Sequence, residues 1–187
     1  TYLALFLSQF DFQGNAKKYL DLIAETLHKD FFGEKVGLAY TDPKMGELTM
    51  NAGVFHFNKE SADNTIALNF RYPQGVDVDG IKAGLEKLEG PKAVSLSEHG
   101  HVPHYVPVND PMVETLLSVY EKQTGLKGHE QIIGGGTFGR LLKRGVAYGA
   151  MFPGYVNTMH QANEFTEVED LYRAAAIYAE AIYELIK

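Results

Sequence analysis

Cysteine is absent from this sequence of 187 residues. Its absence excludes disulfide bonds, thiolate metal sites and cysteine nucleophiles together. Any metal ion would therefore have to be bound by histidine, aspartate or glutamate side chains.

Basic runs and long apolar runs are missing as well. The formal net charge is -7 and the sequence pI is about 5.5, which disfavours nucleic acid or an anionic membrane surface as a partner. No stretch approaches the roughly 20 apolar residues of a membrane span, and no basic segment followed by an apolar run marks a secretory signal. These absences favour a cytoplasmic location.

The residues that are present can form a real core, because 45% of them are hydrophobic, and the length allows as many as two small domains. In the first half, the spacing of apolar residues predicts amphipathic helices over residues 15–29 and 77–88. Residues 47–57 and 65–72 alternate and predict an antiparallel hairpin, with one face of its first strand formed by Leu48, Met50, Ala52 and Val54. A short strand over residues 93–96 would complete a ferredoxin-like α+β arrangement.

The second half predicts an α/β arrangement after a boundary rich in Gly, His and Pro at residues 99–108. Asp110 and Pro111 begin a helix that Gly125 ends. Two short strands are expected, over residues 131–133 and 146–148. A last helix is expected to start with a capping box of Thr166 and Glu169, and its predicted buried stripe comprises Leu171, Ala175, Tyr178, Ile182 and Leu185.

Arg71 is one candidate for ligand binding. It lies on the strand face opposite Ile66 and Leu68, just before Pro73 ends the strand, where a guanidinium could grip a carboxylate through two parallel hydrogen bonds. The competing interpretation is a solvated surface arginine paired with a local acid.

A glycine-rich loop, Gly134-Gly135-Gly136-Thr137, is the second candidate. Its glycines let backbone amides approach a ligand, and a following helix would add a favourable dipole for an anion, with Arg140 as a possible reinforcement. A tight strand-to-helix turn explains the same pattern equally well.

His160 is the third candidate, because a Pro/Gly loop presents it ahead of the last helix and neutral imidazole is a common metal ligand. Glu164 could support it as an outer-sphere acid. A catalytic zinc needs about three protein ligands, so one histidine is not a site. The histidines at 99, 101 and 104 are expected to be polar linker residues, and the His28-x-Asp30 pair is expected to lie on the surface.

These motifs resemble the end of PepV-type zinc dipeptidases, a family within the metallopeptidase clan of aminoacylases, carnosinases and carboxypeptidases. The first part of the chain is similar to their inserted lid domain, through Asn69-Phe70-Arg71-Tyr72-Pro73. The remaining matches come in the family's order: Gly134-Gly135-Gly136-Thr137-Phe138-Gly139-Arg140, Val146-Ala147-Tyr148-Gly149, Met151-Phe152-Pro153-Gly154, His160-Gln161-Ala162-Asn163-Glu164 and Tyr178-Ala179-Glu180-Ala181-Ile182-Tyr183-Glu184.

The resemblance implies a lid over residues 1–104 and the C-terminal part of an α/β catalytic domain over residues 105–187. It implies that His160 binds one of two zinc ions and that Arg71 binds the C-terminal carboxylate of a dipeptide, in a pocket also lined by Gly135, Gly136 and Thr137. In the family, metal-bound hydroxide attacks the peptide bond with a glutamate as general base.

The family's His-x-Asp motif, its paired glutamate and its remaining metal carboxylate have no counterpart in this sequence. Leu3, Phe6 and Phe10 also lie at helical spacing with no capping residue before them, which predicts an element cut open at its N-terminus. We therefore expect the missing N-terminal part of the catalytic domain to be a required partner, no catalytic residue to lie in this chain, and the chain alone to be inactive.

Two other functions fit the same residues. A ferredoxin-like fold with a glycine loop could be a non-catalytic ligand-binding or dimerisation module. Such a module should close its own core, whereas part of a dipeptidase should leave the sheet edge near residues 131–133 open. A related acylase, acting on N-acyl amino acids, would keep the chemistry and change only what the lid admits.

Overall fold

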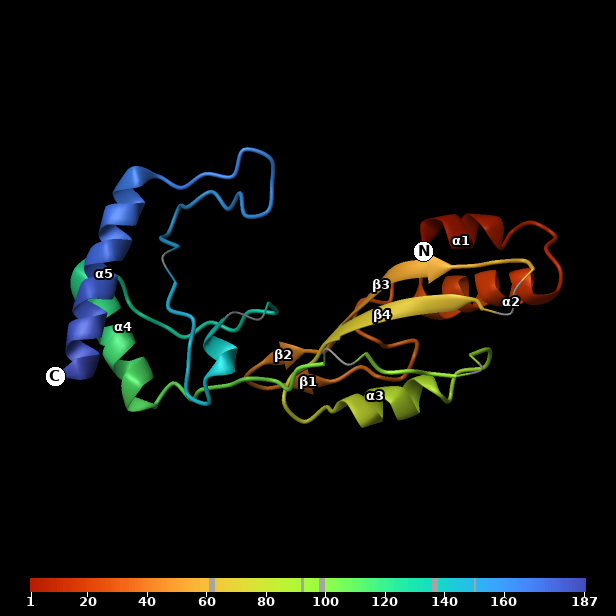
Figure 1. Ribbon diagram of the computed structural model, residues 1–187, viewed down its shortest axis with the longest axis horizontal. Coiled ribbons are helices and arrows are strands. Elements are labelled where there is room, and N and C mark those ends of the chain that lie inside the picture. The colour runs from red at the N-terminus through yellow and green to blue at the C-terminus, as the bar shows by residue number, and fades with distance from the viewer. Residues whose placement is uncertain (61–62, 92, 98–99, 136–137, 150) are drawn as a thin grey trace. The chain divides into compact units, whose positions relative to one another are not determined.

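The chain forms two compact units in the computed structural model, Thr1–Pro103 and His104–Lys187 (Figure 1). Helices combine with small antiparallel strand pairs, which confirms the predicted mixture of α and β structure. The structure describes residues 1–60, 63–91, 93–97, 100–135, 138–149 and 151–187.

An antiparallel hairpin forms the centre of the first unit. Its strands are β3 (Thr49–His56) and β4 (Thr65–Arg71), and Arg71 pairs with Thr49 at one end (Figure 1). The register shifts between Ala52 and Val54, so Val54 pairs with the exposed Ala67. The prediction that Val54 shares a face with Leu48, Met50 and Ala52 is therefore wrong, because one extra residue in a strand reverses the alternation beyond it.

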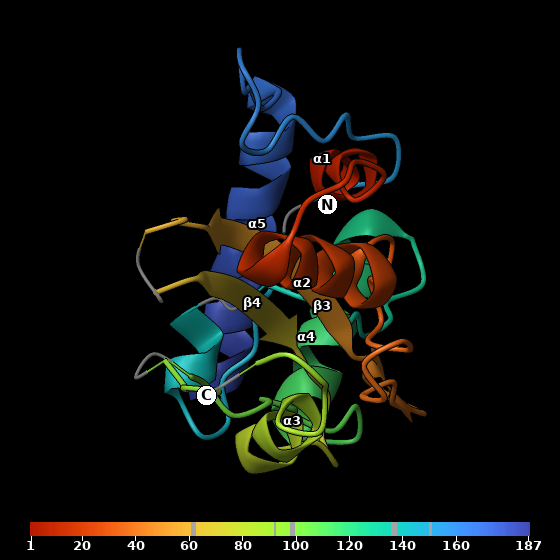
Figure 2. The same ribbon diagram turned by 90° about the vertical axis from the view of Figure 1, so that its right-hand side faces the viewer.

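Helices pack on the inner face of this hairpin. In Figure 2, α2 (Gly14–Leu22) crosses in front of the strands, and it continues into a π-helical turn, η1 (Ile23–Leu27). The preceding α1 (Tyr2–Leu7) contributes Ala4 to the core. The other buried residues of this core are Ile23, Leu27, Val36, Leu48, Met50, Ile81 and Leu85, and Ile66, Leu68 and Phe70 of β4 pack against them.

The helix α3 (Val78–Leu85) of this unit is shorter than predicted. Asp77 is its N-cap, and the Asp77 side chain accepts a hydrogen bond of 2.7 Å from the Gly80 N–H. A second, minimal hairpin pairs β1 (Thr41–Asp42) with β2 (Gly46–Glu47). The strand predicted over residues 93–96 is wrong. A strand requires a partner for its hydrogen-bond ladder, and no ladder includes the described residues of this segment.

Two helices, α4 (Pro111–Thr124) and α5 (Val168–Ile186), pack side by side in the second unit (Figure 1). The limits of α4 are as predicted. Asp110 accepts a hydrogen bond of 2.8 Å from the Met112 N–H, and Gly125 ends the helix in the left-handed conformation with φ of 68°. The buried core between the helices consists of Leu116, Val119, Phe152, Ile177 and Ala181.

The predicted buried stripe of α5 is wrong. The residues of α5 that are buried are Ala174, Ile177 and Ala181, whereas Ile182 in the predicted stripe is 60% exposed. Apolar residues extend so far around this helix that spacing alone admits either face. The capping box is also wrong, because Glu167 is the N-cap and makes no side-chain hydrogen bond to the first turn.

The strands predicted over residues 131–133 and 146–148 are not formed: among the described residues of this unit, none belongs to a strand ladder. Side-chain bonds hold the second segment instead. The Tyr148 hydroxyl donates to the Leu116 carbonyl at 2.7 Å, and the Tyr178 hydroxyl donates to the Tyr148 carbonyl at 3.2 Å. Burial raises the pKa of Tyr148 to about 12. Across the described ranges, no helix is both long and apolar enough to cross a membrane.

Candidate functional site

The loop that carries His160 is closed at its base by hydrogen bonds. The Phe165 N–H donates to the Thr158 hydroxyl at 3.2 Å, and the Tyr155 hydroxyl donates to the Phe165 carbonyl at 3.3 Å. Phe152 fixes the start of the loop in the core, where the Arg173 guanidinium lies 3.9 Å from its ring centroid. These contacts hold both ends of a short segment and leave His160 at its tip.

His160 itself has an uncommon backbone conformation. Its φ is 63°, in the left-handed region, and Asn163 has a φ of 60°. Glu164 accepts a hydrogen bond of 3.3 Å from the backbone N–H of His160. In this arrangement the glutamate supports the loop backbone, and the His160 residue is exposed.

No cluster of metal ligands among the described residues includes His160. Within the described part of the chain, no group of three or more histidine, aspartate or glutamate residues is placed to hold a metal ion. His104 is engaged elsewhere, with its Nε2 donating to the Gly145 carbonyl at 2.6 Å. His101 is exposed, and His99 lies outside the described residues. The residues present therefore fit a single ligand contribution and not a complete zinc site.

Only part of the glycine-rich loop can be placed. Gly134 and Gly135 are exposed, and a Cβ added at Gly135 would meet no atom within 4 Å, so this backbone is open to an approaching ligand. Gly136 and Thr137 lie outside the described residues. The helix that follows, η2 (Phe138–Leu141), is a single 3-10 turn. The predicted helix dipole is therefore lost, because four residues provide too few aligned peptide groups.

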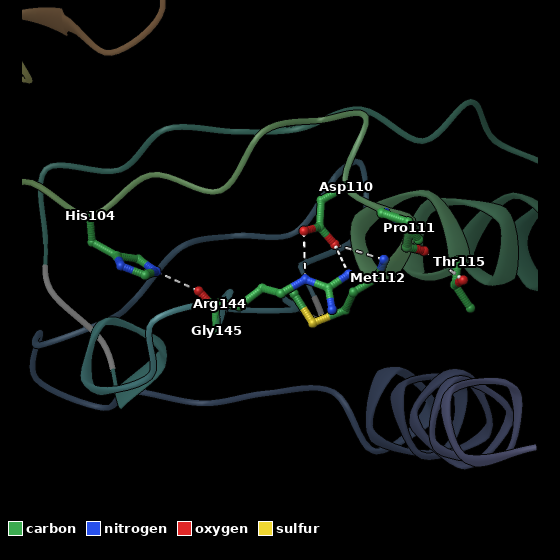
Figure 3. A network of polar contacts seen from close by, with 7 residues as sticks. All are labelled: His104, Asp110, Pro111, Met112, Thr115, Arg144 and Gly145. Carbon is green, nitrogen blue, oxygen red and sulfur yellow. Dashed lines mark hydrogen bonds and ion pairs between the residues drawn. The ribbon is translucent and has the colours of Figure 1, made fainter.

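The segment after the loop is tightly fixed within the second unit. A Cβ at Gly139 would lie 2.9 Å from the Val146 carbonyl carbon, so only glycine permits this contact between backbones. Arg144 grips Asp110 with two bonds, from Nε at 2.6 Å and from Nη2 at 2.7 Å (Figure 3). The Arg144 guanidinium lowers the pKa of Asp110.

Sequence patterns did not identify this network, because Asp110 and Arg144 are far apart in sequence and no periodicity links them. For the close backbone contact with Val146, the glycine at 139 within the motif Gly134–Arg140 was the available signal.

Arg71 lies where the alternation of β4 places it. Its side chain is exposed on the outer face with Asn69, while Ile66, Leu68 and Phe70 face the core. In the described portion of the chain, Arg71 forms no ion pair, so the alternative of a surface arginine held by a local acid has no support there.

His28 and Asp30 are buried, with exposed fractions of 8% and 6%, and their predicted surface position is wrong. Tyr2 packs edge-on against the His28 ring at a centroid distance of 4.7 Å, and burial lowers the pKa of His28. The Asp30 carboxylate accepts hydrogen bonds from the backbone N–H groups of Glu34, at 2.9 Å, and Lys35, at 3.0 Å. Asp30 therefore supports the loop that follows it.

The predicted site residues are thus divided between the units, with Arg71 in the first and Gly135 and His160 in the second. The sequence model of peptidase family M20/M25/M40 matches residues 13–184. The chain therefore belongs to this family, and the resemblance to its dipeptidases is confirmed.

Two similar proteins illustrate the relationship. The Beta-Ala-Xaa dipeptidase of Lactobacillus delbrueckii subsp. lactis is 50% identical over 188 residues, which cover 100% of this chain and 40% of that protein. The "Putative dipeptidase YtjP" of Bacillus subtilis (strain 168) is 37% identical over 186 residues, which cover 99% of this chain and 39% of that protein. The chain thus spans about 40% of the length of the curated relatives it matches.

Proposed function

We propose that this chain is part of a zinc-dependent dipeptidase that hydrolyses the peptide bond of dipeptides with a free C-terminal carboxylate. The observation that carries the proposal is the 50% identity to a Beta-Ala-Xaa dipeptidase along the whole chain. In the proposed arrangement, residues 1–104 form the lid, and residues 105–187 form the C-terminal part of the catalytic domain.

Arg71 is the proposed receptor for the substrate carboxylate. Its exposed position on the outer sheet face and the absence of an ion pair to any described residue support this role. A planar guanidinium offers two parallel N–H donors to a carboxylate, which fixes the orientation of the dipeptide as well as its position. Gly135, with Gly136 and Thr137, is proposed to line the same pocket.

His160 is the proposed zinc ligand of this chain. The described residues provide no complete ligand set, and the other ligands and the general base are proposed to come from additional polypeptide. The metal, when bound, supplies Lewis acidity that polarises a carbonyl and activates water. What this chain supplies is an exposed imidazole, held on a loop whose base is closed by Thr158 and Phe165. We therefore expect no turnover from the chain alone.

The test compares Arg71→Ala with the wild type in the complete polypeptide, using a dipeptide and the same dipeptide with its C-terminus amidated. Lost pairing to a desolvated carboxylate costs roughly 2–5 kcal/mol, so kcat/KM for the dipeptide should fall about 30-fold to several thousand-fold. The amidated substrate should be affected much less, because it carries no carboxylate. Lys82→Ala, which removes another cation of the same unit, one that pairs with Glu86 at 3.8 Å, is the control.

Equal losses for the two substrates would exclude carboxylate recognition by Arg71. Binding of a dipeptide by the complete, zinc-loaded polypeptide without hydrolysis would favour the non-catalytic binding module. Hydrolysis of a dipeptide by the 187-residue chain with added zinc would contradict the proposed need for further polypeptide.

A further inference from the structure

Helix α5 is apolar on more than the face that it packs against α4. Its buried residues, Ala174, Ile177 and Ala181, are each followed in sequence by an exposed apolar residue. Successive residues of an α-helix lie about 100° apart, so these exposed residues form a second stripe beside the buried one. We call this stripe the α5 outer face, and it comprises Leu171, Ala175, Tyr178, Ile182 and Leu185.

The exposed apolar surface continues beyond this stripe. Val168, Tyr172, Tyr183 and Ile186 are exposed farther around the helix. A helix that is apolar over most of its circumference is normally buried on more than one side, whereas a helix at the surface of a domain has one apolar stripe. Contiguous exposed apolar surface of this kind marks a site of contact with another surface. A helix of this kind is packed on two sides. In this chain α4 covers one of these sides.

We propose that the α5 outer face is an interface for the polypeptide that the dipeptidase relatives have outside the matched region. The matched region covers only 40% of the Beta-Ala-Xaa dipeptidase, so the larger part of a relative is available to cover this face. The inference rests on the proposed function, in which further polypeptide completes the catalytic domain. The occupant should present an apolar surface, since the stripe contains no charged side chain.

A second copy of this chain fits the face less well. The segment of residues 167–187 carries five acidic residues, Glu167, Glu169, Asp170, Glu180 and Glu184, against two basic residues, Arg173 and Lys187. Pairing two such helices would bring like charges together around the contact, which opposes self-association. The same acidic excess opposes binding to an anionic lipid surface.

The experiment co-expresses the chain with an affinity-tagged segment of the Lactobacillus delbrueckii dipeptidase that contains the part outside the matched 188 residues. The amount of chain retained with the tagged segment is measured, and the purified pair is examined by sedimentation velocity. Ile182→Lys and Leu185→Lys place a charge in the α5 outer face. Glu169→Lys places the same side chain at an exposed position on the charged side of the helix. Circular dichroism of each variant alone verifies its helix content.

The unmodified chain and Glu169→Lys should be retained, and both outer-face variants should be retained at least tenfold less. Retention of Ile182→Lys at the level of the unmodified chain would overturn the proposal, and so would failure of the unmodified chain to associate. A dimer of the chain alone that Ile182→Lys dissociates would assign the face to a second copy. Association is measured without turnover, so a pair that associates but hydrolyses no dipeptide would count against the proposed function and leave the interface in place.

Discussion

Ile177→Ala should strongly destabilise the second unit, because Ile177 is only 3% exposed in the core between α4 and α5. The substitution removes three carbon atoms, each worth about 0.8 kcal/mol of burial, or roughly 2.4 kcal/mol together. The cavity left among Leu116, Val119 and Phe152 adds to this, and measured costs for such changes are about 2–5 kcal/mol.

The assay is thermal unfolding of the 187-residue chain, followed by calorimetry and circular dichroism. For a domain of roughly 60–100 residues, each 1 kcal/mol shifts the midpoint by about 4–8 °C, so the transition of the second unit should fall by about 10 °C or more. Ile182→Ala is the matched control. It makes the same chemical change at a neighbouring turn of α5, where the side chain is 60% exposed, and should alter stability by less than about 0.5 kcal/mol.

The comparison decides which face of α5 is buried in this chain. If Ile182→Ala lowered the midpoint as much as Ile177→Ala, the stripe predicted from sequence would be the buried one. The packing of α5 on α4, and with it the exposed outer face, would then be refuted.

Two further perturbations test the segment around the glycine-rich loop. Gly139→Ala should lower the thermal unfolding midpoint of the second unit by several degrees, because its Cβ would press on the Val146 backbone. Gly149→Ala is the control and should have little effect, because the added Cβ would have no atom within 4 Å. Equal shifts of the midpoint in the two variants would refute the close contact. Asp110→Asn keeps a good N-cap but loses the charge pairing with Arg144, so it should remove part of the stability that the wild type has above about pH 4. Because the folded-state pKa of Asp110 is lowered, the wild type loses this stability as the pH falls below about 4. The measurement is the free energy of unfolding in urea as a function of pH. If Asp110→Asn lost stability below about pH 4 as the wild type does, the charge pairing of Asp110 with Arg144 would be contradicted.

Elements with local signals could be predicted from the sequence. Asp110, Pro111 and Gly125 define both ends of α4, because capping depends on residues within one turn of the helix end. The face of β4 that carries Arg71 follows from simple alternation, and the structure has the same arrangement. The order of motifs from Gly134 to Glu184 was sufficient to identify the family, which the comparison confirms.

Features that depend on distant partners could not be predicted in this way. The strands over residues 131–133 and 146–148 have suitable side chains, but a ladder needs a neighbouring strand that local sequence does not specify. The burial of His28 depends on Tyr2, which precedes it by many residues. The register shift after Ala52 likewise reversed one half of β3 without any change in composition.

The motifs predicted individual candidate site residues, and the structure adds their backbone conformations and hydrogen bonds. His160 lies on a loop with a closed base, and Arg71 lies on an exposed sheet face, as expected. Glu164 bonds to the backbone of His160, a detail that the spacing of four residues did not distinguish from a bond to the imidazole. Among the described residues, no three histidine, aspartate or glutamate side chains are grouped to hold a metal ion.

The positive φ of His160 restricts which side chains can replace it during evolution. Glycine, asparagine and aspartate tolerate that backbone geometry, whereas β-branched residues are strongly disfavoured there. A substitution at this position therefore changes the free energy of folding, whatever it does to the chemistry of the side chain. Glycine would adopt this conformation at lower cost, so the imidazole at position 160 is carried at some expense to the folding free energy.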